Sequence, residues 1–162
     1  MSLLGLIPLS FFLWCEKTHL GLWIKNGTWT FATIETIHIM ALAVLLGTLV
    51  VVDLRLLGFG MLRQSPSYLA QLMAPWTYGT LVVMVLTGIC MFVSEANRLS
   101  QSGPFALKML LLVLAVATHF TVRAKVIGEG VSLSSRLPKV VAGLSIVFWF
   151  GVALAGRAIP FL

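Results

Sequence analysis

Four long apolar stretches decide what this chain can fold into. They cover about residues 31–52, 75–95, 104–122 and 138–156. A helix needs about 20 apolar residues to cross the roughly 30 Å hydrocarbon core of a bilayer, and each stretch is close to that length. Inside lipid, backbone amides need partners within their own segment, which an α-helix supplies. The sequence therefore predicts an all-α membrane protein, a four-transmembrane-helix up-down bundle with short connections.

The composition excludes the main soluble classes. Hydrophobic residues make up 59% of the chain and charged residues only 10%, too few charges for the polar shell of a water-soluble domain. The net charge is +6, but the basic residues lie between the apolar stretches and not along one face. They are expected to contact the headgroups of the lipid bilayer, and no nucleic-acid partner is expected.

The N-terminal segment, residues 3–14, is apolar but too short to span a bilayer, and Pro8 interrupts it. It lacks the basic start and small-residue cleavage site of a signal peptide, so we expect it to be retained. An interfacial helix is the better prediction. A polar connector follows, with Trp23 and Trp29 suited to the headgroup level. We therefore divide the chain into 1–28, an interfacial helix with its connector, and 29–162, the four-helix bundle.

Basic residues predict the orientation. Loops one and three carry Arg55, Arg63, Arg123, Lys125, Arg136 and Lys139, whereas the other side carries Lys17, Lys25, Arg98, Lys108 and Arg157. Two of the second set, Lys108 and Arg157, are helix-end residues. The positive-inside rule then places loops one and three in the cytoplasm and both termini outside.

Ionisable residues inside the spans are the candidates for a functional site, because they are costly there. A rise of about 1.5 Å per residue places one polar layer in the outer half of the bundle. Its members come from all four helices: Glu35, His38, Glu95, Lys108 and Arg157. In a second interpretation the helix-end members snorkel to water, and Glu35 and His38 form a pair satisfied within the bundle.

Two histidines on different spans, His38 and His119, suggest ligation of a b-type haem iron. However, His38 lies about 22 Å above Asp53, whereas His119 lies about 6 Å above Arg123. One haem bridging both is therefore not expected without a large helix tilt. Two versions stay open: a haem in the outer layer, with His38 and His19 as ligands and Lys108 and Arg157 paired with propionates, or separate inner and outer sites.

Each histidine also has a structural interpretation. His119 could be a core residue bonded to a backbone carbonyl or to the region of Asp53. His19 lies in the polar connector, where an ordinary surface histidine is favoured. The two cysteines form no CxxC pair, and the sequence has no serine–histidine–carboxylate set, P-loop or HExxH motif. No catalytic residues are predicted, and the chain would be at most a redox subunit.

Several short motifs resemble an uncharacterised bacterial family of small four-span inner-membrane proteins, a domain of unknown function. They include IETIH at 34–38, VVDLRLLG at 51–58, APW at 74–76, PF-x-x-K at 104–108 and AGR-x-I at 155–159. The resemblance covers essentially the whole chain. It implies the four-span fold and a location in the bacterial inner membrane. It also implies that Glu35, His38, Lys108, His119 and Arg157 match the family's pattern, but it supplies no activity.

Three functions stay open. The first is an electron-transfer subunit that binds haem b and links a periplasmic partner to the quinone pool. The second is a non-catalytic accessory or anchoring subunit of a larger complex, with a protein partner in the membrane or periplasm. The third is a small-solute or proton carrier that uses Glu35 and His38 as a relay.

Overall fold

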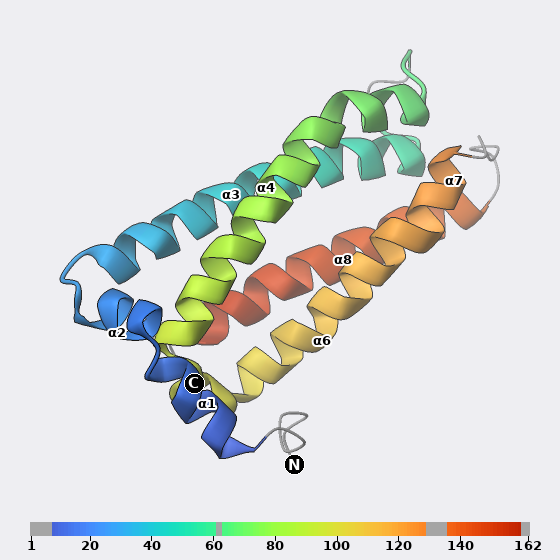
Figure 1. Cartoon of the computed structure of the whole chain (residues 1–162). Helices are drawn as coiled ribbons and strands as arrows, with labels where there is room; N and C mark the ends of the chain where they lie inside the picture. Colours follow the sequence, from blue (N-terminus) through green and yellow to red (C-terminus); the bar gives the residue numbers. More distant parts are fainter. Residues whose placement is uncertain (1–7, 61–62, 129–135, 160–162) are drawn as a thin grey trace.

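The computed structural model describes residues 8–60, 63–128 and 136–159. This part of the chain is helical and contains no strand. Four of its segments are long and apolar enough to cross a membrane (Figure 1). They are α3 (Thr30–Leu57), α4 (Pro66–Ser94), α8 (Arg136–Ala158) and a third span made of α6 (Gly103–Thr118), η2 (His119–Arg123) and α7 (Ala124–Gly128). The predicted all-α membrane fold with four spans is confirmed.

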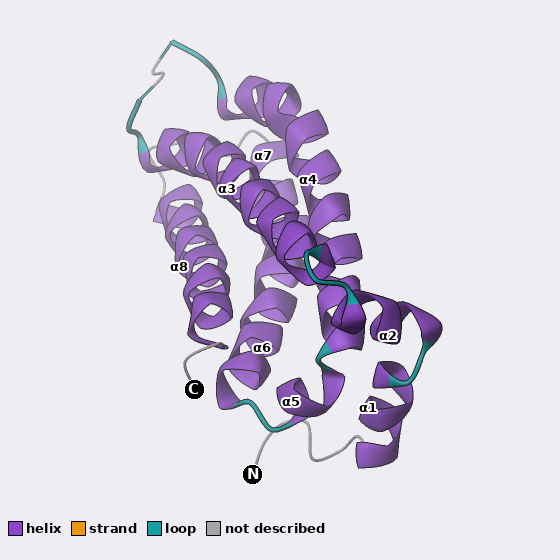
Figure 2. Cartoon of the chain, turned by 90° about the vertical axis from the view of Figure 1, so that its left-hand side faces the viewer, coloured by secondary structure: helices purple, strands orange, loops and turns teal. Residues whose placement is uncertain are grey.

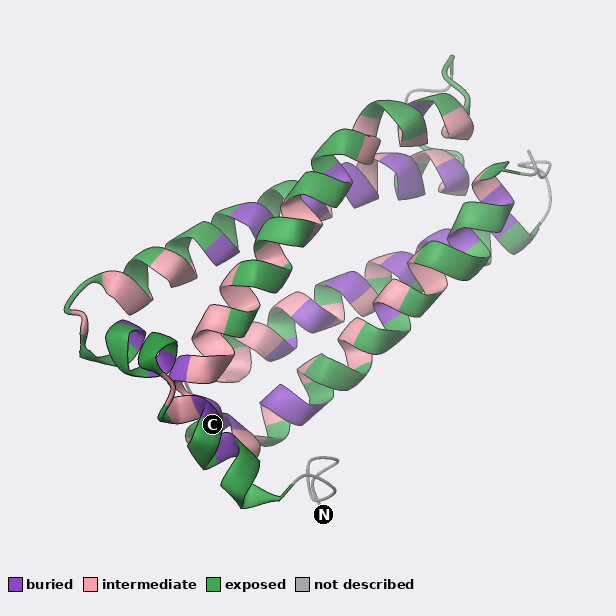
Figure 3. Ribbon diagram, viewed as in Figure 1, coloured by how far each residue is buried: buried purple, intermediate pink, exposed green. Residues whose placement is uncertain are grey.

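Helix α3 has two neighbours among the long helices. It packs against α4 on one side and against α8 on the other, and α6 packs on α8 (Figures 1 and 2). The apolar core forms where α3, α6 and α8 meet, around Leu45, Leu49, Ala115, Trp149 and Val152. The buried residues lie on the sides of α3 and α8 that face the bundle, and α4 has few buried residues (Figure 3). Helix α4 reaches the third span mainly through α7, which leaves the seam between them the most open one.

The second span begins earlier than the sequence predicts. Ser65 caps α4, its hydroxyl accepting from the amide of Tyr68 at 3.1 Å, and Pro66 occupies the first turn. Pro75, predicted to open the span, lies inside the helix, so that prediction is wrong. The physical reason is that the serine–proline start is a strong helix signal, whereas membrane helices tolerate an internal proline.

The third span continues beyond its predicted end. The apolar stretch predicts an end at about residue 122, but the helical segment runs on to Gly128, and Arg123 is buried within it. The arginine is tolerated because it has an acidic partner on α3, described below. The first span is also longer than predicted and ends at Gly58, whose φ of +90° is the left-handed conformation favoured after a helix C-terminus. Pro104 and Pro138 stand in the first turns of α6 and α8, as expected.

The N-terminal segment forms two short helices, α1 (Leu9–Glu16) and α2 (His19–Asn26). Together with α5 (Ala96–Ser100) they gather at the end of the bundle where α4 finishes (Figures 1 and 2). Phe12 and Cys15 of α1 are buried there against Ala96 and Phe92. Pro8 precedes α1 as its N-cap residue, so the described helix begins only after this proline. Residues 3–7 of the predicted segment, and Gly130 with the serine-rich 131–135, lie outside the described residues.

Candidate functional site

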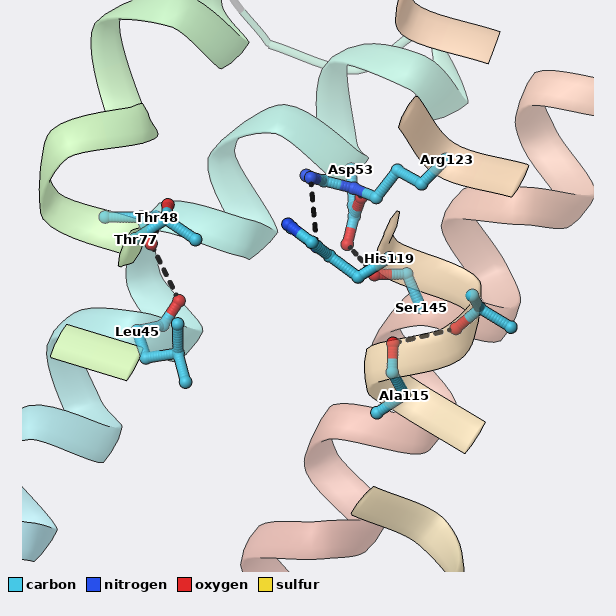
Figure 4. Close-up of polar contacts among 9 residues, drawn as sticks. Leu45, Thr48, Asp53, Thr77, Ala115, His119, Arg123 and Ser145 are labelled. Carbon is cyan, nitrogen blue, oxygen red and sulfur yellow. Dashed lines mark hydrogen bonds and ion pairs between the residues drawn. The ribbon is translucent and has the colours of Figure 1, made fainter. Parts of the chain in front are cut away.

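A buried charged cluster joins three of the four spans. Arg123 of η2 donates from Nε to Asp53 of α3 at 2.9 Å, and Ser145 of α8 donates to the other carboxylate oxygen at 2.7 Å (Figure 4). The side chains of Asp53 and Arg123 are only 1% and 7% exposed. A buried charge is tolerated when it is paired and hydrogen-bonded, and both carboxylate oxygens are satisfied here. This inner cluster ties α3, the third span and α8 together at one depth.

His119 belongs to the inner cluster. Its Nδ1 lies 3.5 Å from Nη1 of Arg123. Since a guanidinium can only donate, Nδ1 is the acceptor, and the hydrogen of the neutral ring is then on Nε2. The imidazole is surrounded by aromatic rings, with centroids 6.4 Å from Tyr78, 5.1 Å from Phe120 and 6.5 Å from Trp149. The interpretation of His119 as a core histidine near Asp53 fits this geometry.

The backbone around His119 and Arg123 is a π-helix, η2, rather than α-helix. Such turns leave some carbonyls without regular partners and occur often at functional sites. Two threonine hydroxyls donate to backbone carbonyls in this region: Thr118 to that of Leu114 at 2.8 Å, and Thr121 to that of Ala117 at 2.6 Å. The local irregularity therefore coincides with the buried arginine.

A cavity of about 190 Å³ opens beside the inner cluster, in the seam between α4 and the third span. Arg123 and His119 form its polar side. Most of the other lining residues are apolar or aromatic, among them Val52, Ala74, Tyr78, Phe120 and Ile127. Thr77, also in the lining, is hydrogen-bonded to Thr48 of α3 at 3.0 Å. The Nη2 atom of Arg123 is buried and has no hydrogen-bond partner among the described residues.

His38 lies at the other end of the bundle and is 9% exposed. Its Nδ1 is 2.7 Å from the hydroxyl oxygen of Thr87 on α4. That hydroxyl has a single hydrogen and lies 2.7 Å from the carbonyl of Val83, to which it donates. Both hydrogen bonds form when Nδ1 carries the hydrogen and the hydroxyl oxygen accepts. In the neutral ring, Nε2 then holds a free lone pair, as a metal-binding imidazole requires.

A glycine of α4 and a lysine of α6 lie near His38. A Cβ added at Gly88 would stand 3.5 Å from Cε1 of His38, so α4 approaches the imidazole closely there. Lys108 of α6 acts on His38 electrostatically and packs on α8, where a Cβ added at Gly156 would stand 3.3 Å from its Nζ. His38 and Lys108 belong to the predicted outer layer, and Thr87, Gly88 and Gly156 lie beside them on α4 and α8.

The other predicted residues lie at the edges of this layer. Glu35 is partly buried on α3, and no hydrogen bond or ion pair joins it to a described residue. Glu95 forms a surface ion pair with Arg98 at 3.2 Å, which fits the snorkelling interpretation. Arg157 is exposed near the end of α8. His19 is exposed in the first turn of α2, and none of the described contacts joins it to His38.

The structure does not bring His38 and His119 together. Their partners on α4, Thr87 and Tyr78, are nine residues apart, about 13 Å along the helix. The separation estimated from the sequence depends on Asp53 and Arg123 lying at one depth, and these two residues are in contact. Within the described residues, no group of three or more His, Cys, Asp and Glu side chains could hold a metal ion.

Sequence reasoning missed the inner cluster as a site. The sequence prediction places Asp53 and Arg123 near the same depth but does not pair them. A signal was present, because the two carry opposite charges near the same end of neighbouring apolar helices. Ser145 and Thr87 gave no such signal, since hydroxyl residues are common in membrane helices and satisfy themselves on the backbone.

Comparison with known proteins gives a family but no activity. No curated protein and no solved structure matches the chain. A family model described as "Family of unknown function" matches residues 11–162, nearly the whole chain. The chain therefore belongs to this family of unknown function, DUF6644.

Proposed function

We propose that the protein is an electron-transfer subunit of the bacterial inner membrane that holds a b-type haem through His38 and links a periplasmic partner to the quinone pool. One observation carries the proposal. His38 is buried, and its hydrogen bond to Thr87 leaves Nε2 as a free donor of electrons to a metal. An imidazole held in this way by a second residue is the usual arrangement of a metal-ligating histidine.

The outer layer has further features that suit the group. Gly88 removes side-chain bulk beside the imidazole, and Lys108 brings a positive charge suited to a propionate. Arg157 follows Gly156 near the end of α8 and is a second candidate to pair with a propionate. Haem with one histidine ligand occurs widely, so His119 is not needed. When bound, the haem would supply one-electron redox chemistry, and the chain's own residues would bind and orient it.

His119 is the matched control for His38. Both are partly or fully buried imidazoles in the spans, but Nδ1 of His119 accepts from Arg123, so the hydrogen of its neutral ring is on Nε2. Without a change of tautomer, His119 offers no lone pair to iron at Nε2. A difference between the two variants would therefore reflect ligation and not the mere loss of a buried ring.

The test is a visible spectrum of protein purified in detergent after expression with ample haem, oxidised and then reduced with dithionite. We expect a Soret band in the wild type and in His119→Ala, and its loss in His38→Ala. Thr87→Val should retain a weakened band, because loss of such a supporting hydrogen bond typically lowers metal affinity about 10–100-fold. Absence of a Soret band in the wild type, or its full retention in His38→Ala, would refute the proposal.

The membrane and orientation are tested separately. The positive-inside pattern and the family resemblance support an inner-membrane location with both termini in the periplasm. Alkaline phosphatase fused after residue 162 should be active, since that enzyme needs an oxidising compartment. Fusion after Gly58, at the end of α3, should be inactive. The reverse pattern would overturn the orientation.

A further inference from the structure

The cavity beside Arg123 has the size of one six-membered ring. Its volume is about 190 Å³, and an apolar protein cavity of about 150 Å³ is known to bind benzene. Much of its wall is flat or small: the rings of Tyr78 and Phe120, which stack at 6.1 Å, and the methyl groups of Ala70 and Ala74. A planar ring would therefore find aromatic and aliphatic contacts on several sides.

The polar side of the cavity carries a hydrogen-bond donor that has no acceptor among the described residues. Nη2 of Arg123 is buried without a partner among the described residues, although Nε and Nη1 of the same guanidinium are in contact with Asp53 and His119. A buried donor left without a partner costs free energy. In Figure 4 the guanidinium reaches from the third span toward the side where Thr77 lies, and Thr77 lines the cavity. A ligand oxygen in the cavity would satisfy Nη2.

The charge balance favours a neutral ligand. Asp53 pairs with Arg123 at 2.9 Å, so the cluster carries no net charge to hold an anion, and a carboxylate or phosphate would be repelled by Asp53. A carbonyl oxygen accepts a hydrogen bond without bringing charge. Tyr78 and Phe120 are each about half exposed on the surface of the spans. A ligand would therefore reach the cavity from the lipid.

We infer that this cavity binds the head group of a membrane quinone, with one ring carbonyl accepting a hydrogen bond from Nη2 of Arg123 and the ring lying against Tyr78 and Phe120. The inference deepens the proposed function by giving the quinone a site. It concerns binding alone, which needs neither haem nor His38. Failure of one proposal can therefore be told from failure of the other.

The test is equilibrium binding of decylubiquinone to the purified full-length protein in nanodiscs, with empty nanodiscs to subtract partitioning. We expect saturable binding by the wild type and by His38→Ala. Ala74→Phe places a ring in the cavity and should weaken binding at least tenfold. Ala117→Phe adds the same group at an exposed position of α6 that does not line the cavity, and binding should be unchanged.

Arg123→Lys keeps the charge that Asp53 needs but removes the forked donor, and binding should weaken about tenfold or more. Should Ala74→Phe fail to elute as a single folded species, Ala70→Leu, in the same lining, decides the point by the same criterion. No saturable binding by the wild type would mean that the cavity holds only water or lipid, and the inference would be wrong. Wild-type affinity in the folded cavity-filling variant would overturn it equally.

Discussion

Breaking the buried pair between Asp53 and Arg123 should cost far more than its replacement by apolar residues. Asp53→Ala leaves the guanidinium, with a side chain only 7% exposed, without its acidic partner. Removing one partner of a buried ion pair typically costs about 3–5 kcal/mol, because the remaining charge is uncompensated. Arg123→Met should cost a similar amount, since Asp53 would keep only the hydroxyl of Ser145.

The double variant Asp53→Ala/Arg123→Met removes both charges. Apolar replacement of a whole buried pair is often neutral or stabilising, so the double variant should be more stable than Asp53→Ala alone. Unfolding by SDS in mixed micelles, followed by far-ultraviolet circular dichroism, gives the free energy of unfolding of each variant. If the two single costs simply add in the double variant, the residues are not coupled and the reasoning is refuted.

An exposed pair in the same chain provides the control. Lys25 and Glu16 are 2.9 Å apart at the N-terminal helices, with side chains 49% and 17% exposed. Pairs of this kind contribute about 0–1 kcal/mol. Lys25→Ala should therefore change the free energy of unfolding by less than about 1 kcal/mol. A cost equal to that of Asp53→Ala would show that burial does not explain the difference.

Three further changes test local packing. Ser145→Ala should cost about 1.5–3 kcal/mol on the same assay, because a hydrogen bond to a buried carboxylate is lost; a cost near zero would contradict the cluster. Gly21→Ala should destabilise the N-terminal helices, since the new Cβ would meet the backbone oxygens of Glu16 and Val93 at 2.9 and 3.0 Å. Gly143→Ala is the control and should be neutral or stabilising, because a Cβ there meets nothing within 4 Å. Equal effects of the two substitutions would argue against the close packing of α2 on α1 and α4. Gly88→Leu places a bulky side chain against the imidazole of His38 and should abolish any haem absorbance. Gly79→Leu, where a Cβ meets nothing within 4 Å, should leave the absorbance unchanged, and retention of the band in Gly88→Leu would exclude this placement of the haem.

The fold could be predicted because lipid imposes length and hydrophobicity on every span. Four apolar stretches and their breaks were sufficient to define the bundle. The errors were at helix ends, where the rule used was too simple. Hydrophobicity alone predicts a helix start at Pro75 and a helix end at Arg123. Both lie inside helices, because a capped start lies nine residues upstream of Pro75 and a carboxylate on another span compensates Arg123.

For the two buried histidines, the sequence predicts the position along the helix axes but not the neighbouring side chains. A constant helical rise separates His38 from His119, and the structure places them against α4 residues nine positions apart. The partners of these histidines could not be predicted, because rotation of each helix about its axis decides whether Thr87 or Arg123 faces an imidazole. Helix rotation depends on packing between spans, which one sequence does not specify. The π-helix at His119–Arg123 left no sequence signal that we can identify.

The haem content of the purified protein tests the central claim most directly. Pyridine haemochrome, measured per chain for the wild type, His38→Ala and His119→Ala, reports bound haem independently of its spin state. The account predicts stoichiometric haem b in the wild type and in His119→Ala, and its loss in His38→Ala. Haem-free wild-type protein, or equal haem in all three, would contradict the assignment of His38 as the ligand.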